Sequence, residues 1–213
     1  MCMSYPTNKP LNLPGFKLDI DDGELYYVPS WLSKTESIQL YKTFKDELAW
    51  QQDQLLVFGK WHPIPRLQAW YGEPEASYKF SGQSFTPRTW HAELSLLRQR
   101  LLAIGVSTNA VLANFYRDGH DKMGWHSDNE RSLGIRATIA SISLGAARTL
   151  QLKHKVTGKR IDLLLESGSL LIMAGEMQQY WLHALPARKA VTQGRINLTY
   201  RLVNSAENAW SRI

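Results

Sequence analysis

Seven strand-like segments follow one another through the second half of the chain, and they restrict its fold more than any other feature of the sequence. Each segment is short, apolar or alternating in pattern, and bounded by turns that contain glycine or charged residues, as β-strands are. The segments span residues 111–116, 138–144, 149–154, 161–165, 169–173, 179–184 and 195–202. So many short strands in succession predict an antiparallel sandwich or barrel.

The first half of the chain has a different pattern, with one short strand predicted over 24–28 and two helices. A capping box at 33–36 begins the first helix, which the apolar spacing extends to about Leu48. The second helix is predicted over 91–104, with Gly105 directly after its end. We therefore expect an α+β protein, mainly β, whose helices pack outside the strands.

The composition fits one folded domain, because the 213 residues are 44% hydrophobic and 21% charged. No apolar run approaches the roughly 18 residues needed to span a bilayer, and the N-terminus lacks a signal-peptide pattern. The single cysteine, Cys2, excludes an internal disulfide and fits a reducing compartment. We expect an intracellular protein without membrane association, cytoplasmic in a bacterium or nuclear in a eukaryote. The net charge of +6 mildly favours a polyanionic partner.

Candidate metal ligands begin with His126 and Asp128, which are two residues apart and therefore point the same way from an extended segment. A second histidine would complete the two-histidine, one-carboxylate set of non-haem Fe(II) oxygenases. His183 is the best candidate, because His154 lies among lysines and is expected to be solvated. The alternatives are a surface turn or ion pair at His126–Asp128 and a core histidine at His183.

Two further strands carry rows of polar side chains. Asn114 and Tyr116 share one strand face, although two such residues alone are also typical of a solvent-facing strand. The segment 195–201 alternates strictly, so that one face presents Arg195, Asn197, Thr199 and Arg201. Guanidinium groups bind carboxylates through paired hydrogen bonds, so a small dicarboxylate is a suitable ligand for this row. The alternative is a solvated basic strand that contacts phosphates.

These motifs, N-x-Y, H-x-D-x-E, a distal histidine and R-x-N-x-T-x-R, occur in the order found in the AlkB family of Fe(II)- and 2-oxoglutarate-dependent dioxygenases, which the chain resembles from about Leu56 to Arg201. The resemblance implies a double-stranded β-helix (jelly roll) with flanking helices and an N-terminal nucleotide-recognition lid. It further implies that iron is bound by His126, Asp128 and His183, and that 2-oxoglutarate is held by Asn114, Tyr116, Arg195, Thr199 and Arg201.

The implied organisation is one structural domain in four segments. These are a flexible arm over 1–15, an N-terminal extension with the lid over 16–110, a catalytic core over 111–203 and a tail over 204–213.

A second resemblance, before the iron motif, is to the family members that act on alkylated bases in duplex DNA. It implies that Phe58, Gly59 and Lys60 form a hairpin tip that enters the base stack, while Tyr78 and Phe80 hold the flipped base. Aromatic insertion beside a flipped base is physically reasonable at such a turn. The alternative is that Phe58 and Trp61 are core residues of a β-hairpin. The implied substrate contacts are Phe58, Gly59, Lys60, Arg66, Tyr78, Phe80, Asn129 and Glu130.

Asn129 departs from the family pattern, because several duplex-acting relatives carry an acid there. Glu130 keeps the carboxylate that approaches the exocyclic amino group of the base in relatives. The resemblance implies oxidative demethylation of N1-methyladenine and N3-methylcytosine in DNA, using O₂ and releasing succinate, CO₂ and formaldehyde. We expect a monomer that binds double-stranded DNA. A demethylase of RNA or protein, a 2-oxoglutarate oxygenase with another substrate, and a catalytically inactive DNA-binding module are the alternatives.

Overall fold

The computed structural model describes residues 16–57, 59–76, 78–80 and 83–204. The expected arm over 1–15 and all but the first residue of the expected tail lie outside the described residues. Among the residues described, no helix combines the length and the apolar character that crossing a membrane requires.

A seven-stranded antiparallel sheet forms the largest layer, in the order β1-β2-β13-β10-β15-β8-β5. Its strands are β1 (Phe16–Leu18), β2 (Glu24–Val28), β5 (Leu67–Gly72), β8 (Ala110–Tyr116), β10 (Ile139–Gly145), β13 (Leu170–Ala174) and β15 (Arg195–Arg201). Strands β1, β2 and β5 come from the first half of the chain, so the predicted extension and the predicted core share one sheet.

A four-stranded sheet, ordered β12-β11-β14-β9, forms the second layer. Its strands are β9 (Met123–His126), β11 (Arg148–His154), β12 (Arg160–Leu165) and β14 (Trp181–Leu185). Apolar side chains from the two sheets pack against each other, among them Ile139, Leu152, Leu171 and Trp181. The two facing antiparallel sheets are consistent with the predicted double-stranded β-helix.

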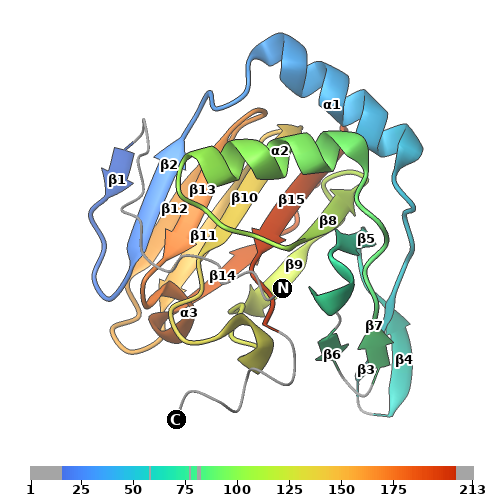
Figure 1. Ribbon diagram of the computed structural model, residues 1–213. Helices are drawn as coiled ribbons and strands as arrows, with labels where there is room; N and C mark the ends of the chain where they lie inside the picture. The colour runs from blue at the N-terminus through green and yellow to red at the C-terminus, as the bar shows by residue number, and fades with distance from the viewer. Residues whose placement is uncertain (1–15, 58, 77, 81–82, 205–213) are drawn as a thin grey trace.

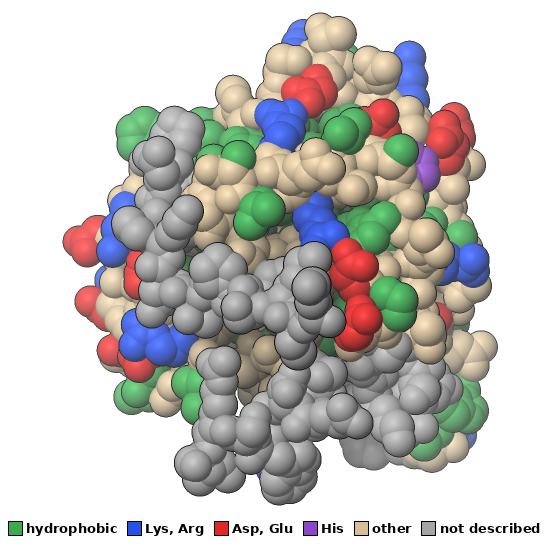
Figure 2. Space-filling view, viewed as in Figure 1, with side chains coloured by type: hydrophobic (Ala, Val, Ile, Leu, Met, Phe, Trp, Pro, Cys, Tyr) green, Lys and Arg blue, Asp and Glu red, His purple; other side chains and the backbone are tan. Residues whose placement is uncertain are grey.

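Two helices cover the outer face of the larger sheet (Figure 1). Helix α1 (Lys34–Glu47) begins at Ser33, whose hydroxyl accepts a hydrogen bond from the Glu36 amide, and α2 (Ala92–Ala103) begins at His91. Buried residues of both helices, such as Phe44 and Leu97, share one core with the sheet. Figure 2 shows that the described residues visible on this helix-bearing face mix Lys and Arg with Asp and Glu. Charge therefore does not distinguish this face as a surface for a polyanion.

Alternation along β15 explains how the pocket and the core are built from one strand. Ile196, Leu198 and Tyr200 face the helices and are fully buried. The arginines at both ends of the strand, with the polar residues between them, face the second sheet. The predicted alternation is therefore confirmed.

Two hairpins lie apart from the main sheets (Figure 1). Strands β3 (Gln54–Val57) and β4 (Lys60–Pro63) pair with each other, as do β6 (Tyr78–Phe80) and β7 (Gln83–Phe85). The remaining elements are the short helices η1 (Pro74–Ala76), η2 (Arg131–Leu133) and α3 (Met177–Tyr180).

The structure corrects two expectations. The strand predicted over 179–184 begins only at Trp181, because the residues directly before it form the short helix that ends at Tyr180. His154 is buried rather than solvated, with only 1% of its surface exposed. Its Nε2 lies 3.1 Å from Asp22 Oδ2, and its Nδ1 accepts hydrogen bonds from the amides of Val156 and Thr157. The lysines around it point elsewhere while the imidazole packs on Trp181.

Candidate metal centre and co-substrate pocket

The structure brings His126, Asp128 and His183 together, with their potential ligand atoms all within 4.8 Å of one another. His126 is the last residue of β9 and pairs directly with His183 on β14. Asp128 follows two residues later and is buried. The third histidine, 57 positions along the chain, is thus delivered by strand pairing in the smaller sheet.

Neighbouring groups fix the orientation of these side chains. His126 Nδ1 lies 2.9 Å from the carbonyl oxygen of Gly124, an arrangement that keeps Nε2 available as a metal ligand. The backbone amide of Asp128 donates to Gln178 Oε1 at 2.9 Å. Gln178 comes from α3, so the short helix that interrupts the predicted strand also supports the metal centre. No sequence pattern indicates this role, because a lone glutamine beside apolar residues is common.

The electrostatics of the centre favour a deprotonated ligand set. Burial alone would raise the pKa of Asp128, but Arg201, His183 and His126 together hold it below the usual value. Burial, with a contribution from nearby His126, lowers the pKa of His183 to about 3. A neutral imidazole and an ionised carboxylate are the forms that bind a metal ion.

A pocket between the two sheets extends from this centre along β15 and β8. It is lined by every residue of the predicted co-substrate set, namely Asn114, Tyr116, Arg195, Thr199 and Arg201. Arg201 donates to Asp128 Oδ1 at 2.9 Å, and Arg195 donates to Ser143 Oγ at 2.9 Å. The Nε atoms of both arginines are buried, and neither has a hydrogen-bond partner within the described part of the chain.

These unpaired donors test whether a dicarboxylate fits. Arg201 already pairs with Asp128, whereas no ion pair found among the described residues includes Arg195. Because a buried guanidinium without an anion is costly, Arg195 favours negative charge from a ligand at its end of the pocket. Arg201 lies at the metal end and Arg195 lies at the opposite end of the same strand. A small acid with a carboxylate at each end could pair one carboxylate with each arginine. The two histidines and one carboxylate fit Fe(II).

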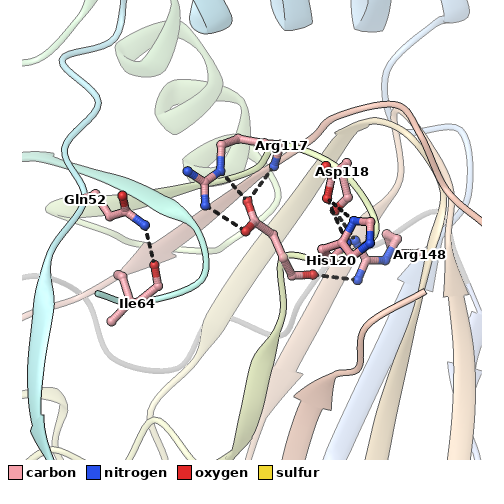
Figure 3. Close-up of polar contacts among 7 residues, drawn as sticks. Gln52, Ile64, Arg117, Asp118, His120 and Arg148 are labelled. Atoms are coloured by element: carbon pink, nitrogen blue, oxygen red, sulfur yellow. Dashed lines mark hydrogen bonds and ion pairs between the residues drawn. The ribbon is translucent and has the colours of Figure 1, made fainter. Parts of the chain in front are cut away.

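Next to the pocket residue Tyr116 lies an arginine that the sequence did not single out. Arg148 is 2% exposed, and its guanidinium donates to the carbonyl oxygens of Asp118, Asp121 and Pro186. Figure 3 shows Arg148 beside the turn that carries Arg117, Asp118 and His120. Such a backbone clamp has no sequence signature.

Tyr116 lies between two guanidinium groups at this end of the pocket. The Arg195 guanidinium is 5.5 Å from the centre of the Tyr116 ring, and that of Arg148 is 5.9 Å away. Cations over an aromatic face are attracted to it and restrict its position. Two cations therefore restrict the position of the predicted co-substrate contact Tyr116.

The residues predicted to contact the substrate do not share one environment, unlike the predicted co-substrate residues, which all line one pocket. Lys60 and Asn129 are exposed, and Gly59 has a φ of 78°, as a tight turn requires. Glu130 Oε2 is buried and has no hydrogen-bond partner among the described residues. The side chains of Phe58, Tyr78 and Phe80 lie outside what the structure describes. Trp61 is 54% exposed and is therefore not a core residue.

Arg66, which the sequence resemblance assigns to the substrate, is buried. It is only 7% exposed, and its Nε donates to Asn114 Oδ1 at 2.9 Å. The structure thus joins a predicted substrate contact to a predicted co-substrate contact.

Two histidines and one carboxylate leave coordination positions open on a metal, and this donor set defines the non-haem Fe(II) oxygenases. The family model of the 2OG-Fe(II) oxygenase superfamily matches residues 24–201. The chain belongs to this superfamily, whose members use Fe(II) and 2-oxoglutarate.

Named relatives are similar over most of the chain. DNA oxidative demethylase ALKBH2 of Mus musculus is 40% identical over 182 residues, which cover 80% of this chain and 76% of the relative. Alpha-ketoglutarate-dependent dioxygenase alkB homolog 3 of Rattus norvegicus is 34% identical, with 82% and 62% covered. The solved structure of OsALKBH1 superposes with a TM-score of 0.55 at 17% identity, covering 83% of this chain and 97% of that one. This last likeness confirms the double-stranded β-helix.

Proposed function

We propose that the protein is an oxidative demethylase of alkylated bases in DNA, dependent on Fe(II), O₂ and 2-oxoglutarate. The observation that carries the proposal is the placement of His126, Asp128 and His183 at one end of a pocket lined by two buried arginines. The names of the relatives, DNA oxidative demethylases at up to 40% identity, supply the substrate class. When bound, iron would supply the oxidative chemistry in which O₂ and 2-oxoglutarate are consumed, succinate and CO₂ are released, and the N-methyl group is removed as formaldehyde.

The protein's own residues position the reactants. His126, Asp128 and His183 would hold the iron. Arg201, beside Asp128, would bind the 2-oxoglutarate carboxylate nearer the metal, and Arg195 would bind the distal carboxylate. Asn114, Tyr116 and Thr199 line the same pocket and would complete the co-substrate contacts. Fixing both ends of the co-substrate keeps its reactive part at the metal.

Glu130 is suited to reading the base. Its buried Oε2 has no hydrogen-bond partner among the described residues, and Glu130 lines a small second pocket together with Arg201, which also lines the co-substrate pocket. A carboxylate oxygen accepts hydrogen bonds from an exocyclic amino group, which both methylated adenine and methylated cytosine carry. No ion pair among the described residues includes Glu130, so the positive charge of these lesions would also suit its carboxylate.

The β3–β4 hairpin would contact the duplex. Its apolar side chains Leu55, Leu56 and Trp61 are 41%, 56% and 54% exposed, an unusual concentration for the surface of a soluble protein. Lys60 sits at the turn beside Gly59, where it can reach a phosphate. An exposed apolar hairpin with a cation at its tip fits insertion beside a flipped base in double-stranded DNA.

The test is a repair assay with N1-methyladenine and N3-methylcytosine oligonucleotides, offered as duplex DNA, single-stranded DNA and RNA. We expect formaldehyde and the restored base only with Fe(II) and 2-oxoglutarate, and fastest in duplex DNA. Faster repair of RNA would identify an RNA demethylase. Turnover of 2-oxoglutarate without repair of any of the three would show an oxygenase with another substrate.

A further inference from the structure

Arg66 is a buried cation whose partner is a neutral amide. It follows the β3–β4 hairpin by three residues and is 7% exposed. Its Nε donates to Asn114 Oδ1 at 2.9 Å, and the Gln68 carboxamide lies 2.8 Å from the same oxygen. None of the ion pairs found among the described residues includes Arg66. Since a buried guanidinium is costly, its retention beside an amide calls for a reason.

Asn114 can be oriented in two ways, and Arg66 selects one of them. A carboxamide has an accepting oxygen at one end and a donating nitrogen at the other, and the two ends are nearly the same size. A guanidinium carries donors only, so it pairs with the oxygen. Asn114 also lines the pocket, and within the described residues no acceptor pairs with its Nδ2. With Oδ1 held by Arg66, those N–H donors are available to the pocket.

We propose that Arg66 is a positioning residue for the binding of 2-oxoglutarate. Arg66 holds the Asn114 carboxamide so that its N–H donors point toward the co-substrate. This inference rests on the proposed function, because it requires that 2-oxoglutarate occupy the pocket. In the opposite orientation, Asn114 would present a carbonyl oxygen to a dianion, and the interaction would be repulsive. Gln68 alone does not select the orientation, because its own amide can donate or accept.

The alternative role for Arg66 is a direct contact with the nucleic acid, as the sequence resemblance implied. Its burial and its bond to Asn114 argue against this role, because a phosphate contact needs an accessible guanidinium. Exposed Lys60, on the neighbouring hairpin, is better placed for a phosphate.

The backbone around Arg66 is fixed on several sides, as a positioning role requires. Figure 3 shows Gln52 bonded to Ile64, where Gln52 Nε2 donates to the Ile64 carbonyl at 3.0 Å. The Ile64 amide in turn donates to the Asp53 carbonyl at 2.9 Å. The Lys122 amide donates to the Pro65 carbonyl at 3.1 Å. The two residues directly before Arg66 are therefore tied to their surroundings.

The experiment measures the dissociation constant of 2-oxoglutarate by calorimetry on the Mn(II)-loaded protein, and that of an unmodified DNA duplex by fluorescence anisotropy. Arg66→Met removes the donors, and we expect 2-oxoglutarate to bind about tenfold more weakly. Arg66→Lys keeps a cationic donor and should stay within about threefold of wild type. Asn114→Ala should bind 2-oxoglutarate about tenfold more weakly. Adding Arg66→Met to Asn114→Ala should change the dissociation constant of 2-oxoglutarate by less than about twofold further.

Several outcomes would overturn the inference. If Asn114→Ala weakens 2-oxoglutarate binding but Arg66→Met does not, the positioning role is wrong while the pocket assignment stands. If Arg66→Met weakens duplex binding alone, Arg66 is a nucleic-acid contact. If Asn114→Ala, Arg195→Met and Arg201→Met all bind 2-oxoglutarate normally, the proposed function itself fails. Should Arg66→Met not fold, Arg66→Gln serves instead, because it keeps the polarity but no longer selects the amide orientation.

Discussion

Arg201 on β15 donates a 2.9 Å hydrogen bond to Asp128, 73 residues earlier in the chain, and both side chains are buried. The bond joins a candidate metal ligand to a candidate co-substrate ligand. Asp128 supplies a negative charge for a metal ion, and Arg201 beside it supplies a positive charge for an acid. A cation and an acid can therefore bind next to each other at this end of the pocket.

We predict that Arg195→Met and Arg201→Met each weaken 2-oxoglutarate binding by tenfold or more, because a charge-assisted hydrogen bond contributes about 1.5–3 kcal/mol. Calorimetry on the Mn(II)-loaded protein measures this effect. Arg160→Met, on an exposed position of β12, is the matched control and should bind normally. An unchanged constant in both pocket variants would assign these arginines to another ligand.

His126→Ala and Asp128→Ala should each abolish turnover while duplex binding stays within about twofold of wild type. The reason is that both side chains face the enclosed centre rather than the hairpin surface. Metal content after dialysis and duplex anisotropy measure the two effects separately. Asp162→Ala, an exposed carboxylate on β12, should retain both metal and activity. Full activity of either ligand variant in metal-controlled buffer would remove it from the metal centre.

The hairpin offers a well-matched pair of variants. Leu56 on β3 is 56% exposed, and Leu102 on α2 is 57% exposed. If the hairpin contacts duplex DNA, Leu56→Ala should weaken duplex affinity several-fold, whereas Leu102→Ala should not change it, since truncating a buried contact costs about 1 kcal/mol or more. Anisotropy with one labelled duplex measures both. From the sequence resemblance we also predict that Phe58→Ala lowers the rate of repair more in duplex DNA than in single-stranded DNA. Equal losses for Leu56→Ala and Leu102→Ala would indicate a general effect on the fold.

The turn at 117–121 has a predictable pH dependence. Burial would raise the pKa of Asp121, but its hydrogen bonds with the side chain and amide of Arg117 lower it overall. A lowered folded-state pKa stabilises the protein above the unfolded value of about 3.9 and loses that contribution as the pH falls through the folded-state value. Asp121→Asn should thus cost about 1 kcal/mol of unfolding free energy at pH 7. Urea denaturation should show this cost shrinking towards pH 3. A cost that is the same at pH 7 and pH 3 would mean that the charge of Asp121 does not matter.

The sequence predicted the parts of the fold that depend on periodicity. The alternation in β15 located both its polar and its apolar face, because every second side chain of a strand shares a side. Ser33 was predicted as the first helix start because its hydroxyl can cap the helix. His183 was identified as the third ligand candidate by its surroundings, and strand pairing with His126 brings it there.

What the sequence did not show depends on contacts between distant residues. His154 is buried against Tyr180 and Trp181, and its partner Asp22 lies 132 positions away, whereas its sequence neighbours are lysines that suggest a solvated site. Strand β9 is four residues long and contains Gly124, so its pattern is too short to recognise. The bond from Arg66 to Asn114 was not visible in the sequence either, since no local pattern reveals that this guanidinium turns inward.

The β3–β4 hairpin pairs only within itself as a sheet, among the strands that the structure describes, and neither main sheet includes it. Substitutions on its exposed side chains therefore leave the interior packing around the pocket intact. If the hairpin contacts nucleic acid as proposed, a lineage or a protein engineer can change which nucleic acid is bound while the residues around the pocket stay the same.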